Sequence, residues 1–154
     1  MPLKEFSSFY REAFDRVFAV VLAYCGNTDV AFDSTQEAFA RAYSRWRRVA
    51  GADSPTAWVT TTAINVSRRQ FRRRFDQGSR EVAIDPAPST ERIDVMEAVR
   101  GLPDRQREAV ILYYLLDLSV GQVADQMGLS EGAIKAHLFK ARSSLRGVLE
   151  VRHA

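Results

Sequence analysis

Apolar side chains recur at steps of three and four residues along most of this chain, and no stretch alternates apolar and polar residues as a half-buried strand does. The first stripe consists of Phe6, Phe9, Tyr10, Phe14, Val17, Val20 and Val21. This spacing places all of its members on one face of an α-helix. The sequence therefore predicts an all-α fold.

Local signals predict where the helices of the first half begin and end. Asp29 is expected to cap a second helix, which then continues as far as Gly51. Ser54 offers a capping oxygen, and Pro55 suits the first position of a helix because its backbone is already bent correctly. A third long helix is therefore expected from Pro55 to about Phe75.

Residues 76–91 interrupt the helical pattern. Their sequence, DQGSREVAIDPAPSTE, holds one glycine and two prolines among scattered polar residues, a composition typical of a linker. A chain of 154 residues is long enough for two small cores. We therefore expect two small helical bundles, at residues 1–75 and 92–154, joined by this linker.

The end of the chain predicts a helix-turn-helix. Residues 119–145 read SVGQVADQMGLSEGAIKAHLFKARSSL, which places two short helical patterns around a turn. Ala124 is small enough for the helices to approach, Gly128 suits the turn, and Ser130 can cap the second helix. A buried stripe is expected at Ile134, Leu138, Ala141 and Leu145. The opposite face is small and basic, which favours entry into the DNA major groove over a plain helical hairpin.

The positive charge gathers in two places. Residues 1–75 carry 12 Lys/Arg and 7 Asp/Glu, a net +5, whereas residues 76–154 carry 10 and 12, a net −2. Much of the first excess comes from RRQFRRR at residues 68–74, and a second basic patch lies within residues 128–154. Two separate basic patches indicate two contacts with a polyanion.

Several classes of function have no support in the sequence. It contains no P-loop, no dinucleotide fingerprint and no cysteine–histidine metal spacing, so we expect no enzyme, no cofactor and no metal. The longest apolar run, residues 17–25, falls short of the roughly 20 residues that cross a bilayer. No signal-peptide pattern is visible, and the lone Cys25 fits a reducing compartment, so a cytoplasmic location is expected.

The second half closely resembles the fourth domain of bacterial sigma factors of the extracytoplasmic-function (ECF, group 4) type, along LPDRQREAVILYYLLDLSVGQVADQMGLSEGAIKAHLFKARSSLR. Two segments of the first half resemble the same family in the expected order. One is similar to the segment that docks on the clamp helices of the polymerase β′ subunit, DVAFDSTQEAFARAY. The other is similar to the helix that captures the melted −10 element, SPTAWVTTTAINVSRRQFRRR. The resemblance covers nearly the whole chain.

The resemblance implies three sets of site residues. The polymerase-docking set is Asp33, Gln36 and Glu37. The −10 set is Asp53, Ser54, Asn65, Arg68 and Arg69, with residues 51–54 as the loop that holds a flipped base. The −35 set is Lys135, Ala136, His137, Phe139, Lys140 and Arg142.

The chain departs from the family pattern in both halves. Phe32 and Ser34 replace an acidic residue and a leucine that often flank the docking aspartate, and Ala136-His137 replaces a common Ser-Arg pair on the reading helix. Trp58 offers a platform for base stacking, but we expect it mainly in the core.

Three hypotheses follow. The first is a sigma factor that binds promoter DNA and core RNA polymerase, through the β′ clamp helices and the β flap, and that an anti-sigma factor can hold. The second is a dimeric helix-turn-helix regulator of duplex DNA, with residues 1–75 as its dimerisation domain. The third is a helical adaptor that binds another protein and has no role on DNA.

Overall fold

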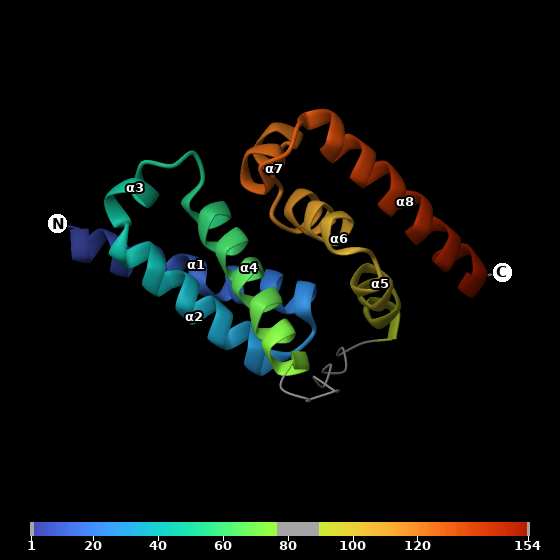
Figure 1. Cartoon of the computed structure of the whole chain (residues 1–154), viewed down its shortest axis with the longest axis horizontal. Coiled ribbons are helices and arrows are strands. Elements are labelled where there is room, and N and C mark those ends of the chain that lie inside the picture. The colour runs from blue at the N-terminus through green and yellow to red at the C-terminus, as the bar shows by residue number, and fades with distance from the viewer. Residues whose placement is uncertain (1, 77–89, 154) are drawn as a thin grey trace. The chain divides into compact units, whose positions relative to one another are not determined.

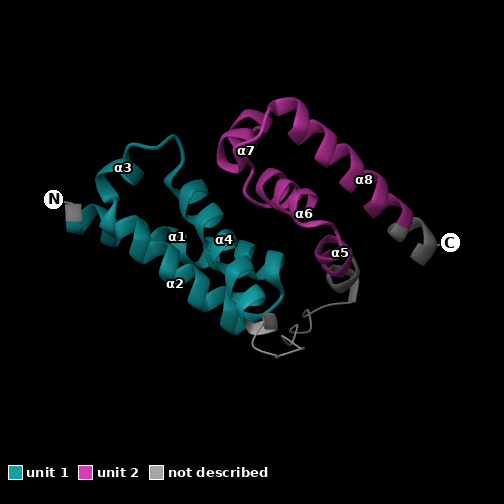
Figure 2. Cartoon of the chain, in the orientation of Figure 1, with its two compact units in different colours: residues 1–84 teal, residues 85–154 magenta. Residues whose placement is uncertain are grey.

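The computed structural model describes residues 2–76 and 90–153, which are mostly helical and contain no strand (Figure 1). The predicted all-α class is therefore confirmed for the described residues. Internal contacts divide the chain into unit 1, residues 1–84, and unit 2, residues 85–154 (Figure 2). Most of the expected linker 76–91 lies outside the described residues, so it stays a prediction.

Unit 1 consists of helices that surround one apolar core. They are α1 (Pro2–Cys25), α2 (Thr28–Ser44), α3 (Trp46–Ala50) and α4 (Pro55–Asp76). α2 packs against both α1 and α4, and α1 also packs against α4. Fully buried core side chains include Val17, Val21, Val30, Phe39, Val49, Val59 and Ile64.

The start of α2 differs from the prediction. Asn27, and not Asp29, is its cap, because the Val30 N–H donates to the Asn27 Oδ1 at 2.9 Å. A capping side chain accepts from a backbone N–H two or three residues later, and Asn27 has that spacing. Asp29 lies inside the first turn, where its carboxylate faces the positive end of the helix dipole.

The predicted end of α2 is also wrong, because the helix was expected to continue as far as Gly51. The helix ends at Ser44, Arg45 leaves the helical conformation at φ −121°, and the short α3 follows. The Ser44 hydroxyl donates to the Arg41 carbonyl at 2.9 Å, a local bond that competes with helical pairing. After this break the Trp46 ring packs 5.3 Å from the Phe9 ring.

The start of α4 agrees with the sequence. The helix begins at Pro55, and the Ala57 N–H donates to the Ser54 Oγ at 3.1 Å. Val59 is fully buried as expected. Trp58 is only half-buried, so the expectation that it lies mainly in the core is met in part.

Unit 2 forms a second helical bundle. Its elements are α5 (Thr90–Arg100), α6 (Asp104–Val110), the π-helical turn η1 (Ile111–Leu115), α7 (Val120–Met127) and α8 (Glu131–His153). α8 packs against α5, α6 and α7. The core includes Val99, Leu102, Ile111, Leu112, Val123, Ile134, Leu138 and Ala141.

The predicted helix-turn-helix is present as α7 and α8. Gly128 ends α7 in the left-handed conformation, with φ 66° and ψ 35°, and its N–H donates to the Ala124 carbonyl. The Ala133 N–H donates to the Ser130 Oγ at 3.1 Å, so Ser130 caps α8 as expected. At the start of α7, Ser119 and Gln122 form a reciprocal capping box that was not predicted from the sequence.

We predict that Gly128→Ala destabilises unit 2 by about 1 kcal/mol, because a side chain strains the left-handed backbone. No atom lies within 4 Å of the added Cβ, so the cost is conformational and not steric. Urea denaturation followed by circular dichroism measures it. The matched control is Gly147→Ala within α8, where the added Cβ also meets nothing and helix propensity predicts a gain of about 0.5–1 kcal/mol. Equal stabilities for the two variants would contradict the argument.

Candidate nucleic-acid interface

One side of α8 combines small, basic and aromatic residues in solvent. Lys135, Ala136 and Lys140 are exposed, and the Phe139 side chain is 69% exposed. Ile134, Leu138 and Ala141 on the other side are buried and hold the helix against the rest of unit 2. An exposed phenylalanine beside two cations offers a partner both an apolar and a charged contact. This side of α8 therefore has the composition of an interface.

His137 differs from the rest of the expected −35 set. It is half-buried, and its Nδ1 is shielded from solvent with no hydrogen-bond partner among the described residues. The Nδ1 side of the imidazole thus faces the protein, and only the rest of the ring is accessible to a partner that binds α8.

Arg142 is exposed but held against η1. Its Nε–H donates to the Tyr114 hydroxyl oxygen at 2.7 Å, and its guanidinium carbon lies 5.7 Å from the centre of the Tyr114 ring. This residue of the expected −35 set therefore has a partner within unit 2 and lies at the edge of an apolar groove.

The groove was not anticipated from the sequence. It has a volume of about 590 Å³ and is lined by Val95, Met96, Val99, Val110, Ile111, Tyr114, Leu115, Arg142, Leu145 and Arg146. Three of its apolar residues, Val95, Tyr114 and Leu115, are 42–49% exposed. Such a patch on a small domain marks a contact with another macromolecule or a ligand. The apolar run ILYYLL was a usable signal, since one helix face cannot bury all of it.

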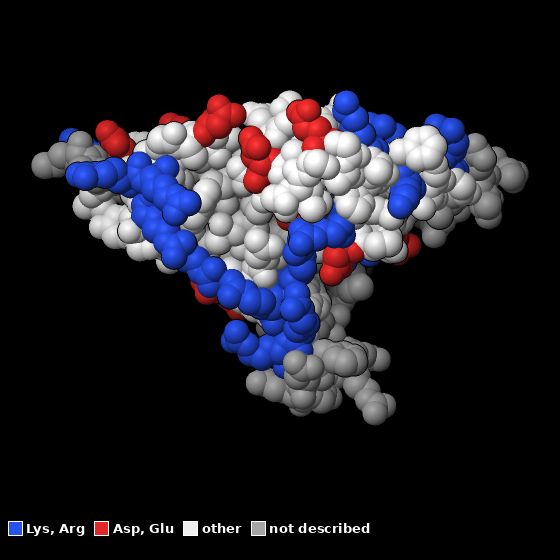
Figure 3. All heavy atoms as spheres, turned by 45° about the horizontal axis from the view of Figure 1, so that its top comes forward, with Lys and Arg blue, Asp and Glu red and all other residues white. Residues whose placement is uncertain are grey.

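The basic region of unit 1 lies on α4 and around α3. Exposed arginines there are Arg45, Arg47, Arg48, Arg69, Arg72 and Arg73. Figure 3 shows many Lys and Arg side chains gathered in a band on one face of the molecule. Such a concentration of positive charge attracts a polyanion over several ångströms in physiological salt.

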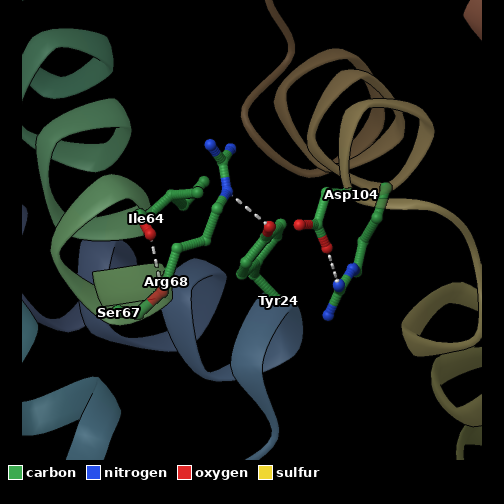
Figure 4. Close-up of polar contacts among 6 residues, drawn as sticks. Tyr24, Ile64, Ser67, Arg68 and Asp104 are labelled. Atoms are coloured by element: carbon green, nitrogen blue, oxygen red, sulfur yellow. Dashed lines mark hydrogen bonds and ion pairs between the residues drawn. The ribbon is translucent and has the colours of Figure 1, made fainter. Parts of the chain in front are cut away.

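The expected −10 residues differ in their surroundings. Asn65 and Arg69 are exposed on α4, and Asp53 is exposed in the preceding loop. Ser54 uses its hydroxyl oxygen to cap α4. Arg68 is partly buried and donates through its Nε–H to the Tyr24 hydroxyl at 2.8 Å (Figure 4).

The expected polymerase-docking residues share one exposed face of α2. Asp33, Gln36 and Glu37 are all exposed. Gln36 accepts a hydrogen bond from the Tyr10 hydroxyl at 3.2 Å, and Glu37 pairs with Arg41 at 2.7 Å. These contacts hold two of the three side chains in place on the surface.

The two departures from the family pattern have different consequences. Phe32 is 46% exposed beside Asp33, so it adds an aromatic ring to the docking face. Ser34 is fully buried, and its hydroxyl has no hydrogen-bond partner among the described residues. The replacement at Ser34 therefore changes the core and leaves the exposed face of α2 unchanged.

Within residues 2–76 and 90–153, no group of three His, Cys, Asp or Glu side chains is arranged to hold a metal ion. None of the described helices combines the length and apolarity that a bilayer-spanning segment needs.

Comparison with known proteins identifies the class of molecule. Residues 9–75 match the family described as Sigma-70 region 2, and residues 92–145 match the family described as Sigma-70, region 4. These are two modules of one kind of transcription initiation protein. The chain belongs to the ECF group of the sigma-70 family of RNA polymerase sigma factors. It functions in promoter recognition and transcription initiation, and the alternative of a dimeric regulator is not favoured.

Individual relatives agree with this assignment. The ECF RNA polymerase sigma factor EcfG of Rhodopseudomonas palustris is 32% identical over 88% of this chain and 79% of that protein. The probable RNA polymerase sigma factor RfaY of Xanthomonas campestris is 32% identical over 86% of this chain, which spans only 37% of that longer protein. Among solved structures, the sigma factor RpoE of Bartonella quintana, in complex with the anti-sigma factor NepR, has a TM-score of 0.82 at 27% identity, covering 96% of this chain and 98% of that one.

Proposed function

We propose that this chain acts as a specificity subunit of RNA polymerase, with no chemistry of its own, and that its two units read two promoter elements. Unit 2 reads the −35 element as duplex, and unit 1 holds the −10 element as it melts. The observation that carries the proposal is the exposed side of α8, with Phe139 between Lys135 and Lys140 directly after a helix-turn-helix turn.

The chemistry of α8 suits duplex reading. Lys135 and Lys140 provide cations for phosphates or for the O6 and N7 acceptors of guanine. Ala136 is small, so the helix backbone can approach the base edges closely. Phe139 has no polar atom, and in the major groove its natural partner is the methyl group of thymine. The recognised −35 sequence is therefore expected to contain at least one thymine.

The chemistry of α4 suits a single strand. Asn65 and Arg69 offer an amide and a guanidinium on one exposed face. A cationic surface binds a strand that is losing its partner, because the bases of such a strand unstack at low cost. The loop at residues 51–54 is proposed to receive one flipped base.

Unit 1 is further proposed to dock on the β′ clamp helices of core polymerase through Asp33, Gln36 and Glu37. Carboxylates at the rim of an interface steer a basic partner and fix its register. The exposed ring of Phe32 extends this face with an apolar contact, and the two kinds of contact together favour a specific interface.

The apolar groove of unit 2 is proposed to receive the β flap of core polymerase. Its lining is apolar with Arg142 and Arg146 at the edge, which suits an amphipathic helix that carries an acidic residue. An anti-sigma factor is proposed as a competing partner. Support comes from the Bartonella quintana relative, whose structure holds an anti-sigma factor. A cytoplasmic location follows from binding to polymerase and DNA.

We predict that Leu115→Asp lowers binding to core polymerase about tenfold, because a carboxylate in the groove must be desolvated by the incoming helix. Folding should be little affected, since Leu115 is 42% exposed. Biolayer interferometry with immobilised core enzyme measures the affinity. Leu3→Asp, on the 61% exposed Leu3 of α1, is the matched control. Equal affinities of the two variants for core polymerase would show that the groove is not part of the polymerase interface.

Size-exclusion chromatography with core RNA polymerase tests the proposed function. The chain is expected to be monomeric alone, to co-elute with core enzyme, and to bind free duplex weakly. A dimeric regulator would instead bind a palindrome tightly without polymerase. An adaptor would show no steep loss of DNA binding as salt rises, because it releases no counterions.

A further inference from the structure

A hydrogen bond within unit 1 joins the carboxyl end of α1 to the arginine-rich part of α4. The Arg68 Nε–H donates to the Tyr24 hydroxyl oxygen at 2.8 Å, and the guanidinium carbon lies 5.6 Å from the centre of the Tyr24 ring. The two residues are 44 positions apart in the sequence. Tyr24 belongs to none of the site sets expected from the sequence or from the family.

Tyr24 is a buried and well-fixed partner for Arg68 within unit 1. The residue is only 2% exposed and lies in the last turn of α1, so its ring has little freedom to turn. An arginine side chain by contrast has many rotamers, most of which are lost when it is held in one geometry. The hydrogen bond from Nε restricts the Arg68 side chain to rotamers that place Nε next to the Tyr24 hydroxyl. Figure 4 shows that the terminal nitrogens of Arg68 then point away from the Tyr24 hydroxyl.

The position of Arg68 on α4 gives this restraint a consequence. Asn65 and Arg72 lie one turn before and one turn after it, and both are exposed, as is the adjacent Arg69. Arg68 itself is partly buried and lies at the margin of this exposed face. Its guanidinium is therefore held beside the surface that is proposed to receive the −10 strand.

We infer that Tyr24 is a positioning residue, which holds the Arg68 guanidinium in the orientation that contacts the phosphate backbone of the melted −10 strand. The inference rests on the proposed function of α4. An arginine ordered before the strand arrives loses little further freedom when the strand binds, so the ordering cost falls on folding and not on strand capture. This lower ordering cost should speed most the step in which the −10 strand leaves the duplex.

A purely structural role is the alternative. The last turn of α1 has no basic residue of its own, and a cation brought there by α4 would offset the negative end of the helix dipole. In that case the Tyr24–Arg68 bond would contribute to folding and would have no effect on DNA. The two roles differ in what a folded variant does at a promoter.

The test is Tyr24→Phe, which keeps the buried ring and removes only the hydroxyl. With core polymerase and a −10/−35 promoter, opening is followed by permanganate reactivity and closed-complex affinity by filter binding. We expect opening to slow about fivefold, as for the loss of one charge-assisted hydrogen bond, with closed-complex affinity unchanged. Arg68→Lys should slow opening similarly, because it keeps the charge and loses the Nε donor.

Three further variants make the result decisive. Tyr24→Phe combined with Arg68→Ala should open the promoter no more slowly than Arg68→Ala alone, since the hydroxyl acts only through the guanidinium. Tyr113→Phe in unit 2 is the control for loss of a tyrosine hydroxyl. Opening at the wild-type rate by Tyr24→Phe, with only a lowered melting temperature, would overturn the inference, and so would additive effects in the double variant. Failure of the wild-type protein to open any promoter would instead reject the proposed function.

Discussion

Replacing Lys135 and Lys140 with glutamate is expected to lower transcription from promoters that depend on the −35 element by roughly 100-fold. Both lysines are exposed on α8, so the variants remove two cations from the reading face and add two anions that the phosphates repel. Each lost contact of this kind typically costs about 1–3 kcal/mol. Run-off transcription with core polymerase on a single promoter measures the effect.

Association with core polymerase should remain unchanged in the same variants, because the docking face of α2 and the groove of unit 2 are intact. Lys4→Glu combined with Arg11→Glu is the matched control, since it reverses two charges at exposed residues of α1. It should transcribe at nearly the wild-type level. Simultaneous loss of transcription and of polymerase association would count against α8 as the −35 reader.

Replacing Arg68 and Arg69 with alanine is expected to slow promoter opening by about 30-fold and to change closed-complex formation by less than about twofold. Both residues lie on the part of α4 proposed to hold the melted strand, and each cation removed weakens a contact with a single-stranded backbone. The strand is available only once the duplex opens, so the earlier duplex-binding step should be spared.

A fluorescent base analogue in the −10 element reports opening, and filter binding reports the closed complex. Lys4→Ala combined with Arg11→Ala removes two exposed cations from α1 and serves as the control. Equal loss of both steps in the Arg68 and Arg69 variant would contradict the division of labour between the units. A salt titration adds a second readout, because the variant should show a shallower dependence of opening on salt.

The features that the sequence predicted best depend on neighbouring residues alone. Gly128 ends α7 and Ser130 caps α8, as their positions around the turn indicated. Ser54 caps α4 before Pro55 for the same reason. In each case one residue type is favoured by the backbone conformation itself, so little depends on the rest of the fold.

The predicted helix boundaries were wrong where two local signals competed, or where distant packing determined the end of a helix. Asn27 and Asp29 are both good capping residues two positions apart, and the sequence does not say which side chain meets an N–H. The break at Arg45 has a local contribution, the bond from the Ser44 hydroxyl to the Arg41 carbonyl, and a distant one. The distant contribution is the packing of Trp46 with the rings of Phe6 and Phe9, which are nearly forty residues away in the chain. No window around Arg45 contains this distant packing.

The surface features that matter most for partners were the hardest to predict. The groove joins Val95, Leu115 and Leu145, which come from three separate helical segments. The Tyr24–Arg68 bond likewise joins α1 to α4. Lys135 and Lys140 are exposed, which agrees with the roles proposed for them. Those roles remain predictions, because exposure does not reveal what a residue binds.

Run-off transcription with purified core polymerase on a pool of random upstream sequences tests the central claim most directly. The account predicts that adding this chain yields discrete transcripts whose templates share two short elements, one near −35 and one near −10. The spacing between the elements should be constant, because two modules on one polymerase read them together. Transcripts that do not depend on the chain, or core enzyme that fails to bind it, would contradict the account.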